Sequence, residues 1–300
     1  MQDLTVETVT DAVLAQMATT RDARLREVMA SLVRHLHDFA RDVRLTPDEW
    51  LTAVGFLTRV GQACTPARQE VILLSDVLGL SALVNLLHDA AASELGTTSS
   101  LLGPFYRDDA PLVPLGGSIV ADANGNELLL HGQVTDNAGR GVPGALIQIW
   151  QTNAEGWYDL QVEGGAAMDM RGNLRCDADG RYHVRTVRPL GYSIPLDGPV
   201  GELVRRQDRH GCRPAHIHFL IGAPGYRELV TALYIGDDPH IDSDTVFGVS
   251  GALVVTPVTN DPAAPIPGLP SIRYDFTLAR DAGAGSNRVG ADPKQILAAD

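Results

Sequence analysis

Residues 213–219 read Arg-Pro-Ala-His-Ile-His-Phe, a segment with two histidines at alternate positions. On a β-strand, side chains two residues apart point to the same face, so His216 and His218 can converge on one point, as a metal site requires. Histidine is the commonest metal ligand, but a pair of hydrogen-bonded histidines on a half-buried strand is the alternative. Two tyrosines in turns rich in Gly and Pro, and an arginine three residues upstream, favour the metal site.

The two tyrosines lie on stiff backbone. Tyr158 follows Gly156 and Trp157, and Tyr192 lies in the turn 189–195. Taken singly, each is typical of a core or turn tyrosine whose hydroxyl finds a partner. A phenol, with an ordinary pKa of about 10, ionises at neutral pH only beside a strong positive charge. Together with two imidazoles, two hard phenolate oxygens would suit a trivalent ion, and ferric iron is the obvious candidate.

Length and composition indicate an ordinary globular protein. Three hundred residues allow one large domain or two modules, and 44% apolar residues are enough for a sizeable core. A formal charge of −13 argues against a nucleic-acid or anionic-membrane partner, which requires a basic patch. Three widely spaced cysteines, a polar N-terminus and no apolar run of about 20 residues predict a cytoplasmic protein without a signal peptide, membrane insertion, disulfide framework or cysteine-based zinc site.

Residues 3–93 have the pattern of helices. Thr46-Pro47-Asp48-Glu49 is a capping box with proline at the first helical position, and Thr65-Pro66 is expected to open the next helix in the same way. Apolar residues recur at three-and-four spacing from Leu25 to Phe39, which predicts an amphipathic helix that contributes to a core or a dimer face. We expect four or five helices with short links.

From about residue 100, short β-rich runs alternate with turn signals such as 136–139 and 177–180. Turns every ~8–12 residues are typical of an antiparallel sandwich. The predicted fold is therefore α+β, with a helical domain over 1–100 and a β-sandwich catalytic domain over 101–300 that ends in an irregular tail at 281–300. The predicted strands are 128–135, 145–151, 173–176, 181–187, 215–221, 229–235, 251–258 and 272–278.

Five segments of the sequence carry a resemblance to a known family: 102–106 (Leu-Gly-Pro-Phe-Tyr), 149–158 (Ile-Trp-Gln-Thr-Asn-Ala-Glu-Gly-Trp-Tyr), 192–195 (Tyr-Ser-Ile-Pro), 213–219 and 223–226 (Ala-Pro-Gly-Tyr). They resemble the intradiol ring-cleavage dioxygenases, the group of catechol and hydroxyquinol 1,2-dioxygenases, and the resemblance covers roughly residues 70–260. It implies that Tyr158, Tyr192, His216 and His218, whose order and spacing match those of the family's ligands, bind a non-haem Fe(III). It also implies that the N-terminal helices form a homodimer and can hold a phospholipid in a tunnel.

The resemblance implies a mechanism that agrees with the chemistry of the ligands. A ferric centre does not easily bind O2 itself, so it has to activate a substrate that coordinates through oxygen anions. A catechol-type diol would bind as a dianion and displace the Tyr192 phenolate, which takes up a proton. O2 would then attack the ring, and Arg213 would stabilise the charge that builds up on it. For Arg213, a salt-bridged loop arginine is the alternative.

The resemblance also implies a flat apolar pocket with few polar groups. Residues 72–79, Ile-Leu-Leu-Ser-Asp-Val-Leu-Gly, resemble the hydroxyquinol branch of the family. Asp76 could accept a hydrogen bond from a third ring hydroxyl, and such a site discriminates strongly against analogues that lack it. An Asp76 that caps or salt-bridges on a helix surface is the alternative. The expected substrate-binding residues are Leu73, Asp76, Leu101, Leu102, Gly103, Pro104, Phe105, Ile194, Pro195, Arg213 and Val246.

The predicted reaction is cleavage of hydroxyquinol (benzene-1,2,4-triol) by O2 to 3-hydroxy-cis,cis-muconate, the tautomer of maleylacetate. Three alternatives stay open: a catechol or chlorocatechol dioxygenase, a non-catalytic β-sandwich binding module, and an Fe(II) or Zn(II) enzyme, for which no carboxylate is suitably spaced. Ala232 departs from several catechol dioxygenases, which have glutamine there. We interpret 242–244 (Asp-Ser-Asp) as a solvated turn. The remaining histidines are interpreted as structural or surface residues: His35, His37, His88, His131, His183, His210 and His240.

Overall fold

The structure is a computed structural model of the 300-residue chain, and it describes residues 4–65, 68–90, 96–121, 123, 126–162 and 168–281. The chain divides into two compact units, Met1–Arg59 and Val60–Asp300. The boundary expected near residue 100 corresponds instead to the change from helices, which end at Ala90, to strands, which begin at Glu127. Apart from Asp281, the predicted irregular tail lies outside the described residues.

The first unit is helical, as expected, with α1 (Val9–Met17), α2 (Ala23–Asp42) and most of α3 (Pro47–Gln62). The predicted capping box at the start of α3 is confirmed. Glu49 N donates to Thr46 Oγ1 at 3.3 Å, and Thr46 N donates to Glu49 Oε2 at 2.9 Å. The apolar stripe of α2 is largely exposed, because Leu25, Leu36 and Phe39 are each about half accessible. Within this chain the stripe therefore forms no core of its own.

Three helices belong to the second unit: α4 (Glu70–Val77), α5 (Leu80–Ala90) and α6 (Pro199–Arg206). The expectation that Thr65-Pro66 opens a helix is wrong, because α4 begins at Glu70. Thr65 and Arg68 instead exchange two backbone hydrogen bonds, of 2.9 and 3.1 Å. The Glu70 carboxylate is fully buried and accepts from Arg68 Nε at 2.8 Å and Val200 N at 3.0 Å. Contacts with a distant segment thus fix the start of α4.

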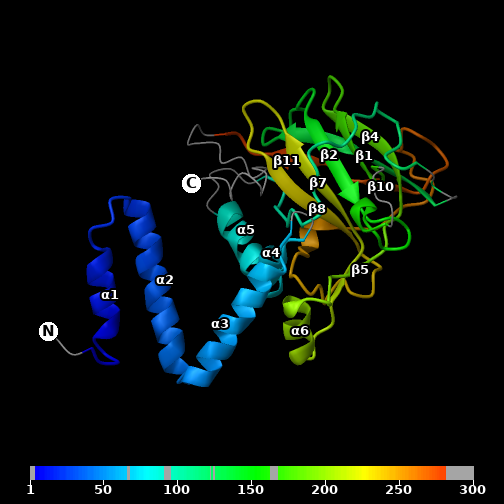
Figure 1. The fold of residues 1–300 in the computed structure, drawn as a ribbon. Helices are drawn as coiled ribbons and strands as arrows, with labels where there is room; N and C mark the ends of the chain where they lie inside the picture. The colour runs from blue at the N-terminus through cyan, green and yellow to red at the C-terminus, as the bar shows by residue number, and fades with distance from the viewer. Residues whose placement is uncertain are drawn as a thin grey trace. The chain divides into compact units, whose positions relative to one another are not determined.

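The described strands of this unit form two larger sheets and a short two-stranded ribbon (Figure 1). The first has the order β10-β1-β11, with β4 also paired to β1, and the second has the order β3-β2-β7-β8-β9. A two-stranded ribbon of β5 (Tyr192–Ser193) and β6 (Cys212–Arg213) lies apart from both. The other strands are β1 (Glu127–Asp136), β2 (Leu146–Gln151), β3 (Arg171–Arg175), β4 (Arg181–Val187), β7 (His216–Gly222), β8 (Leu229–Ile235), β9 (Val254–Val255), β10 (Ser271–Arg273) and β11 (Phe276–Leu278).

The strand predictions are accurate in the middle of the domain and poor at its end. The ranges 181–187 and 229–235 coincide with β4 and β8. The predicted strand 251–258 is mostly a short 3-10 turn followed by β9, and 272–278 is broken into β10 and β11. The sandwich is not purely antiparallel, because β1 pairs in parallel with β10 and β11, and β8 pairs in parallel with β9.

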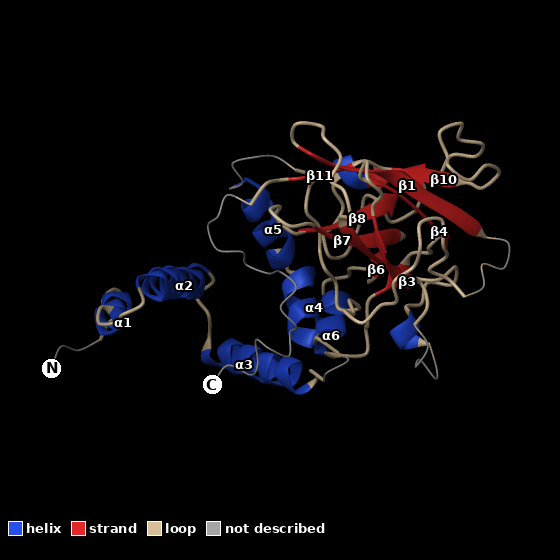
Figure 2. Cartoon of the chain, turned by 90° about the horizontal axis from the view of Figure 1, so that it is seen from above, coloured by secondary structure: helices blue, strands red, loops and turns tan. Residues whose placement is uncertain are grey.

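The second sheet has two buried faces. Ile217, Phe219 and Ile221 of β7 point into the core between the sheets, where the Phe219 ring lies 4.9 Å from that of Phe276 on β11. His216 and His218 alternate with them and point to the opposite face. In Figure 2, α4 and α6 lie on the side of β7 and β8 away from β1 and β10. The two histidines therefore lie on the outer face of the sandwich, beneath helices and loops, and remain buried.

No single helix in the described part of the chain is long and apolar enough to span a membrane. The consecutive helices α4 and α5 pass that test of length and composition only when taken as one pair bent by 71°.

Candidate metal centre and active site

The two histidines of β7 offer lone pairs to a common point. His216 Nδ1 lies 2.7 Å from the Pro214 carbonyl oxygen, which can only accept, so Nδ1 carries the proton and Nε2 has a free lone pair. That Nε2 atom lies 3.1 Å from His218 Nε2 and 3.3 Å from the Tyr158 hydroxyl. All three side chains are almost completely buried. Two other predicted ligands, Tyr158 and His218, therefore lie within hydrogen-bond distance of His216 Nε2.

Tyr158 is positioned by a tight turn after β2. Gly156 has φ of +85°, and a Cβ there would approach the Gly191 carbonyl oxygen to 2.9 Å, so only glycine lets the two tyrosine-bearing turns meet. Tyr158 N donates to Gln161 Oε1 at 3.0 Å at the start of a 3-10 turn, Asp159–Gln161. The Phe105 ring stacks on the Tyr158 ring with centroids 4.2 Å apart. The phenol is therefore fixed from both its backbone and its face.

A buried ion pair between Asp159 and Arg171 stabilises this turn. Asp159 accepts hydrogen bonds from Arg171 of β3, including one from Nε at 2.6 Å. The same guanidinium donates through Nη1 to the Phe105 carbonyl oxygen at 3.0 Å. Arg171 therefore joins the Tyr158 turn to the segment that covers it.

Tyr192 enters from the ribbon of β5 and β6, where it pairs with Arg213. Its ring centroid lies 5.5 Å from that of Tyr158, nearly perpendicular to it, and 5.8 Å from that of His216. Unlike Tyr158, which is completely buried, Tyr192 keeps part of its surface accessible. The structure thus brings all four predicted ligands together, and the two tyrosines differ in how firmly they are held.

The electrostatics of the site suit a cation. Burial, followed by the Arg213 charge, lowers the pKa of His216, and burial, followed by His216, lowers the pKa of His218, so both rings stay neutral. Burial raises the pKa of the Tyr158 and Tyr192 phenols, while Arg213 opposes this rise. Neutral imidazoles are ready to ligate a metal, whereas the phenols need a strong positive charge before they ionise.

The donor set fits a hard trivalent metal. The single lone pair of His216 Nε2 faces two donors, Tyr158 Oη and Arg213 Nη1, each at 3.3 Å, and lies 3.1 Å from His218 Nε2. One lone pair cannot satisfy both donors, and the two imidazole lone pairs have no donor between them. A cation among them would instead draw on both imidazole lone pairs and on phenolate oxygens, a mixed set suited to ferric iron.

Arg213 is both buried and paired. Its Nε lies 3.2 Å from Asp244 Oδ1 and its Nη2 lies 3.4 Å from Asp244 Oδ2. The interpretation of 242–244 as a solvated turn is therefore wrong for Asp244, which is only 7% exposed and also accepts from Gly248 N at 3.0 Å. The salt bridge expected as the alternative for Arg213 exists, and it aims the guanidinium at His216.

A cavity of about 420 Å³ adjoins the centre, lined by parts of α4, α5 and the segment 99–106. Its lining includes the predicted substrate-binding residues Asp76, Leu101, Leu102, Gly103 and Pro104. The backbone at Gly103 comes so close that a Cβ there would lie 3.3 Å from His218 Nε2. The other predicted residues, Leu73, Phe105, Ile194, Pro195, Arg213 and Val246, do not line this cavity, although Phe105 stacks on Tyr158.

Asp76 is not the helix-surface residue that the alternative interpretation expected. It lies on α4, is 6% exposed, and burial raises the pKa of its carboxyl, opposed by the Ser81 hydroxyl and then by the Arg213 charge. Its charge also acts on the Tyr192 phenol, whose pKa it helps to raise. The carboxyl is therefore a buried polar group on the same side of the site as Tyr192 and Arg213.

Several residues of the site were not anticipated from the sequence. Trp150 of β2 stacks on His218 with ring centroids 4.9 Å apart, and Tyr234 of β8 lies across from His216 with its hydroxyl 2.8 Å from Ser100 Oγ. The hairpin register also places Ala232 across from His218, so this position adds no hydrogen bond to the imidazole. Tyr234 could have been found by pairing the predicted strands 215–221 and 229–235 end to end.

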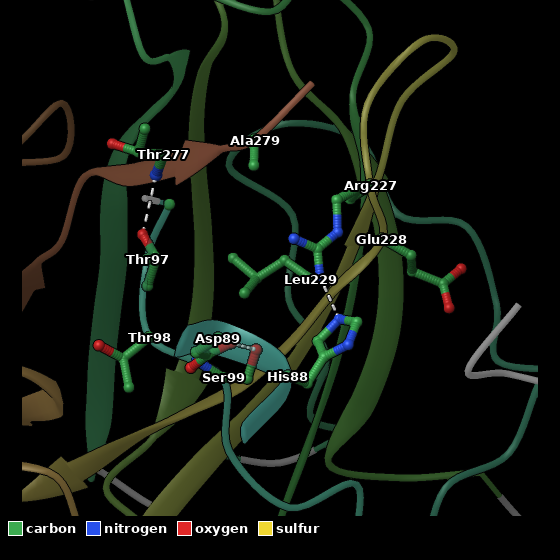
Figure 3. Close-up of a pocket in the computed structure, with 11 residues that line it drawn as sticks. His88, Asp89, Thr97, Thr98, Ser99, Arg227, Glu228, Leu229, Thr277 and Ala279 are labelled. Carbon is green, nitrogen blue, oxygen red and sulfur yellow. Dashed lines mark hydrogen bonds between the residues drawn. The ribbon is translucent and has the colours of Figure 1, made fainter. Parts of the chain in front are cut away.

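A smaller cavity of about 90 Å³ lies between α5, the segment 96–99, β8 and β11 (Figure 3). Its polar groups bond with one another across these elements. Thr277 N donates to Thr97 Oγ1 at 2.8 Å, Asp89 accepts from Ser99, and Arg227 contacts His88. The cavity shares no residue with the four predicted ligands, and these contacts attach α5 to the second sheet.

The chain is similar to known dioxygenases over most of its length. The family model "Dioxygenase" matches residues 103–280, and the model "Catechol dioxygenase N terminus" matches residues 22–96. The 6-chlorohydroxyquinol 1,2-dioxygenase of Cupriavidus pinatubonensis is 47% identical over 254 residues, 85% of this chain and 92% of that protein. The hydroxyquinol 1,2-dioxygenase of Rhodococcus opacus is 45% identical over 86% of this chain and 85% of its own length.

A solved structure extends the likeness to three dimensions. The hydroxyquinol 1,2-dioxygenase of Pseudomonas putida superposes with a TM-score of 0.85 at 40% identity, covering 92% of this chain and 99% of its own. The predicted resemblance and the predicted α+β class are confirmed. The chain belongs to the intradiol ring-cleavage dioxygenase family and, with it, to the enzymes.

Proposed function

We propose that this chain cleaves hydroxyquinol with O2 between its two adjacent hydroxylated carbons, giving 3-hydroxy-cis,cis-muconate, the tautomer of maleylacetate. The observation that carries the proposal is the convergence of Tyr158, His216 and His218, with the Tyr192 ring beside them, next to a cavity that holds the buried Asp76 carboxyl. The names of the three similar proteins, each a dioxygenase of hydroxyquinol or 6-chlorohydroxyquinol, support a triol as substrate.

The four converging side chains would hold a non-haem Fe(III) ion. When bound, it would supply the positive charge that ionises the phenols and withdraws electron density from a coordinated diol. The protein's own contribution begins with Tyr158, which is locked beneath Phe105 and stays in place. His216 and His218 are held neutral by burial, and so remain available as ligands.

Tyr192 and Arg213 would act directly on the substrate. Tyr192 is the more accessible tyrosine and sits on a strand of only two residues, so its phenolate is the one free to swing away and take a proton from the diol. Arg213, neighbouring it across the ribbon, would stabilise negative charge on the ring after O2 attacks. Asp244 is a positioning residue, because it holds the guanidinium without facing the cavity beside Asp76.

Asp76 would select the triol. Its buried carboxyl lies among apolar cavity walls, where a third ring hydroxyl is a suitable hydrogen-bond partner. A diol that lacks this hydroxyl would leave part of the hydrogen-bonding capacity of the buried carboxyl unused, so it should be turned over poorly. The remaining expected substrate contacts, from Leu73 to Val246, would form the apolar walls around the ring.

The helical part, residues 1–100, would serve dimerisation and supply Asp76, while 101–300 would supply the four metal ligands and Arg213. The exposed apolar stripe of α2, together with Trp50, Leu51 and Leu57 on α3, supports a homodimer with room for a phospholipid. Three free cysteines in this chain support a reducing, cytoplasmic location.

The test compares turnover of hydroxyquinol and catechol by the iron-loaded enzyme, measured as O2 uptake and as formation of the ring-opened acid. We expect wild type to prefer hydroxyquinol, and Asp76→Ala, which removes the acceptor, to reduce the ratio of the kcat/KM values for hydroxyquinol and catechol by ~100-fold or more. Asp197→Ala, on an exposed carboxylate, is the matched control. A catechol preference in both wild type and Asp76→Ala would refute the substrate assignment, and an absence of ring cleavage would refute the activity.

A further inference from the structure

A second group of ligand-type side chains lies outside the centre described above. His210, Cys212 and His240 offer ring nitrogens and a thiol that lie within 4.8 Å of one another. The His210 and His240 rings have centroids 5.0 Å apart. Cys212 belongs to β6, next to Arg213, while His240 comes from the loop after β8. Two segments that are distant in sequence thus present three metal-ligating groups to one point.

We propose that His210, Cys212 and His240 form a second metal site that takes a zinc-class divalent cation. A thiolate with two imidazoles is a borderline-soft donor set, which favours Zn²⁺ over the hard ions that suit phenolates. On binding, the thiol proton is released to solvent and the thiolate becomes a ligand. The site differs in chemistry from the phenolate-imidazole centre, so the two would hold different metals.

The geometry requires only a small adjustment. Zinc bonds of ~2.0–2.3 Å place neighbouring ligand atoms ~3.3–3.8 Å apart. Because the three ligand atoms already lie within 4.8 Å of one another, they need to approach by at most about 1.5 Å. His210 is exposed, so a change in the orientation of its ring would displace no core side chain. Its Nδ1 now accepts from Cys212 N at 3.1 Å, a contact that coordination through Nδ1 would replace. A cavity of about 710 Å³ beside His210 leaves room for a water molecule as fourth ligand.

The position of the site gives it a mechanical role. Consecutive residues of a strand point to opposite faces, so Cys212 faces away from the side where Arg213 meets His216. A metal there would link β6 to the loop of residues 238–245, which carries Asp244, the partner of Arg213. That loop is already joined to this region, because Thr245 N donates to the Cys212 carbonyl and Asp238 accepts from Ala215 N. The cation would therefore stabilise the position of Asp244, which holds Arg213 in place, and it would not contact the substrate.

The decisive experiment titrates Co²⁺, a spectroscopic substitute for Zn²⁺, into the iron-loaded enzyme. We expect one equivalent of cobalt to give a thiolate-to-cobalt charge-transfer band in the near ultraviolet, which the phenolate-imidazole centre cannot produce because it contains no cysteine. Cys212→Ser and His240→Ala should abolish the band. Cys64→Ser, which removes another partly buried cysteine, should keep it. Absence of the band from wild type, or its persistence in Cys212→Ser, overturns the proposal.

Two further measurements do not depend on how the variants fold. Zn²⁺ should raise the melting temperature of wild-type enzyme by a few degrees at ~100 times its dissociation constant, and EDTA added to the zinc-treated sample should return the melting temperature to its starting value. Zn²⁺ should also slow alkylation of Cys212, followed by peptide mass spectrometry, by ~10-fold or more, while Cys64 reacts at an unchanged rate. Equal alkylation rates with and without zinc, or an unchanged melting temperature, would contradict a site at these residues.

Discussion

The two faces of β7 are equally buried and chemically opposite. Ile217, Phe219 and Ile221 pack into the sandwich core, whereas His216 and His218, one residue out of step, meet the phenols and Arg213. An alternating polar-apolar pattern usually indicates one dry and one solvated face. Here the polar face is covered by helices and loops, so its polarity is not explained by contact with water, and we attribute it to the proposed metal centre. Burial alone does not distinguish core from active site, but the direction of the side chain does.

The largest expected effect comes from the polar face. His216→Ala removes a proposed iron ligand and the acceptor for Tyr158 and Arg213, so we expect bound iron and ring-cleavage activity to fall by more than ~100-fold. Even the partners that orient metal ligands typically cost ~10–100-fold when they are removed. Ile217→Val, the adjacent residue on the apolar face, should keep iron and activity and lose only ~0.5–1.5 kcal/mol of stability. For both variants, metal analysis measures the bound iron, O2 uptake measures the activity, and urea denaturation measures the stability. Equal activity losses in the two variants would contradict the division between the faces.

On the apolar face, Phe219→Ala should cost ~3–5 kcal/mol of unfolding free energy, because the ring is completely buried against Phe276. The expected result is a large drop in the urea midpoint, with no change in substrate preference for whatever fraction remains folded. Chemical denaturation and the ratio of hydroxyquinol to catechol turnover report the two outcomes separately. A changed preference at unchanged stability would show that the two faces are not independent.

Gly156→Ala disturbs the junction that brings the two tyrosines together. The residue has φ of +85° and a new Cβ would meet the Gly191 carbonyl oxygen at 2.9 Å, so we expect a loss of ~1–3 kcal/mol together with weaker iron binding. Gly139→Ala, also at positive φ but with open space around its Cβ, separates backbone strain from the steric clash. Iron content should fall only in the Gly156→Ala variant. An equal loss of iron in both variants would mean that backbone strain, and not the clash with Gly191, causes the effect.

A smaller and more gradual effect should appear with pH. Burial lowers the pKa of His216 and His218 in the folded protein, so below the unfolded value of ~6.5 the unfolded chain takes up protons that the folded chain does not. The iron-free protein should therefore be most stable above that pH and lose up to ~1.4 kcal/mol per pH unit for each histidine as the pH falls. Urea denaturation of wild type and His218→Gln between pH 5 and 7 tests this, and identical slopes would contradict it.

Local pattern was enough to predict some parts of the fold. The capping box at Thr46, the strands β4 and β8 and the change from helices to strands follow from short-range signals. The start of α4 could not be read locally, because it depends on Glu70 binding Arg68 and Val200. The break between β10 and β11 is also a tertiary effect, since Gln133 N of β1 bonds to the Asp275 side chain in place of a backbone carbonyl.

The site shows the same limit. The resemblance supplied four ligands that the structure brings together, and their roles remain predictions for experiment. It did not supply Asp244, which lies 31 residues from Arg213 and looked like part of a solvated turn. Nor did spacing connect His210 and Cys212 with His240, because their proximity depends on how the loop after β8 returns to β6. Pairs that meet through loops have no periodic signature in the sequence.

The covering of the outer face has a practical consequence for dissecting the protein. Leu101, Leu102 and the Asp76 helix precede residue 103, where the match to the "Dioxygenase" family model begins. A fragment that starts at residue 103 would retain Tyr158, Tyr192, His216 and His218 but would lack the residues that cover them. The space proposed for the aromatic ring of the substrate would then be open to water. Residues on both sides of position 103 therefore line the proposed active site, so a fragment that starts where the family match starts would lack part of it.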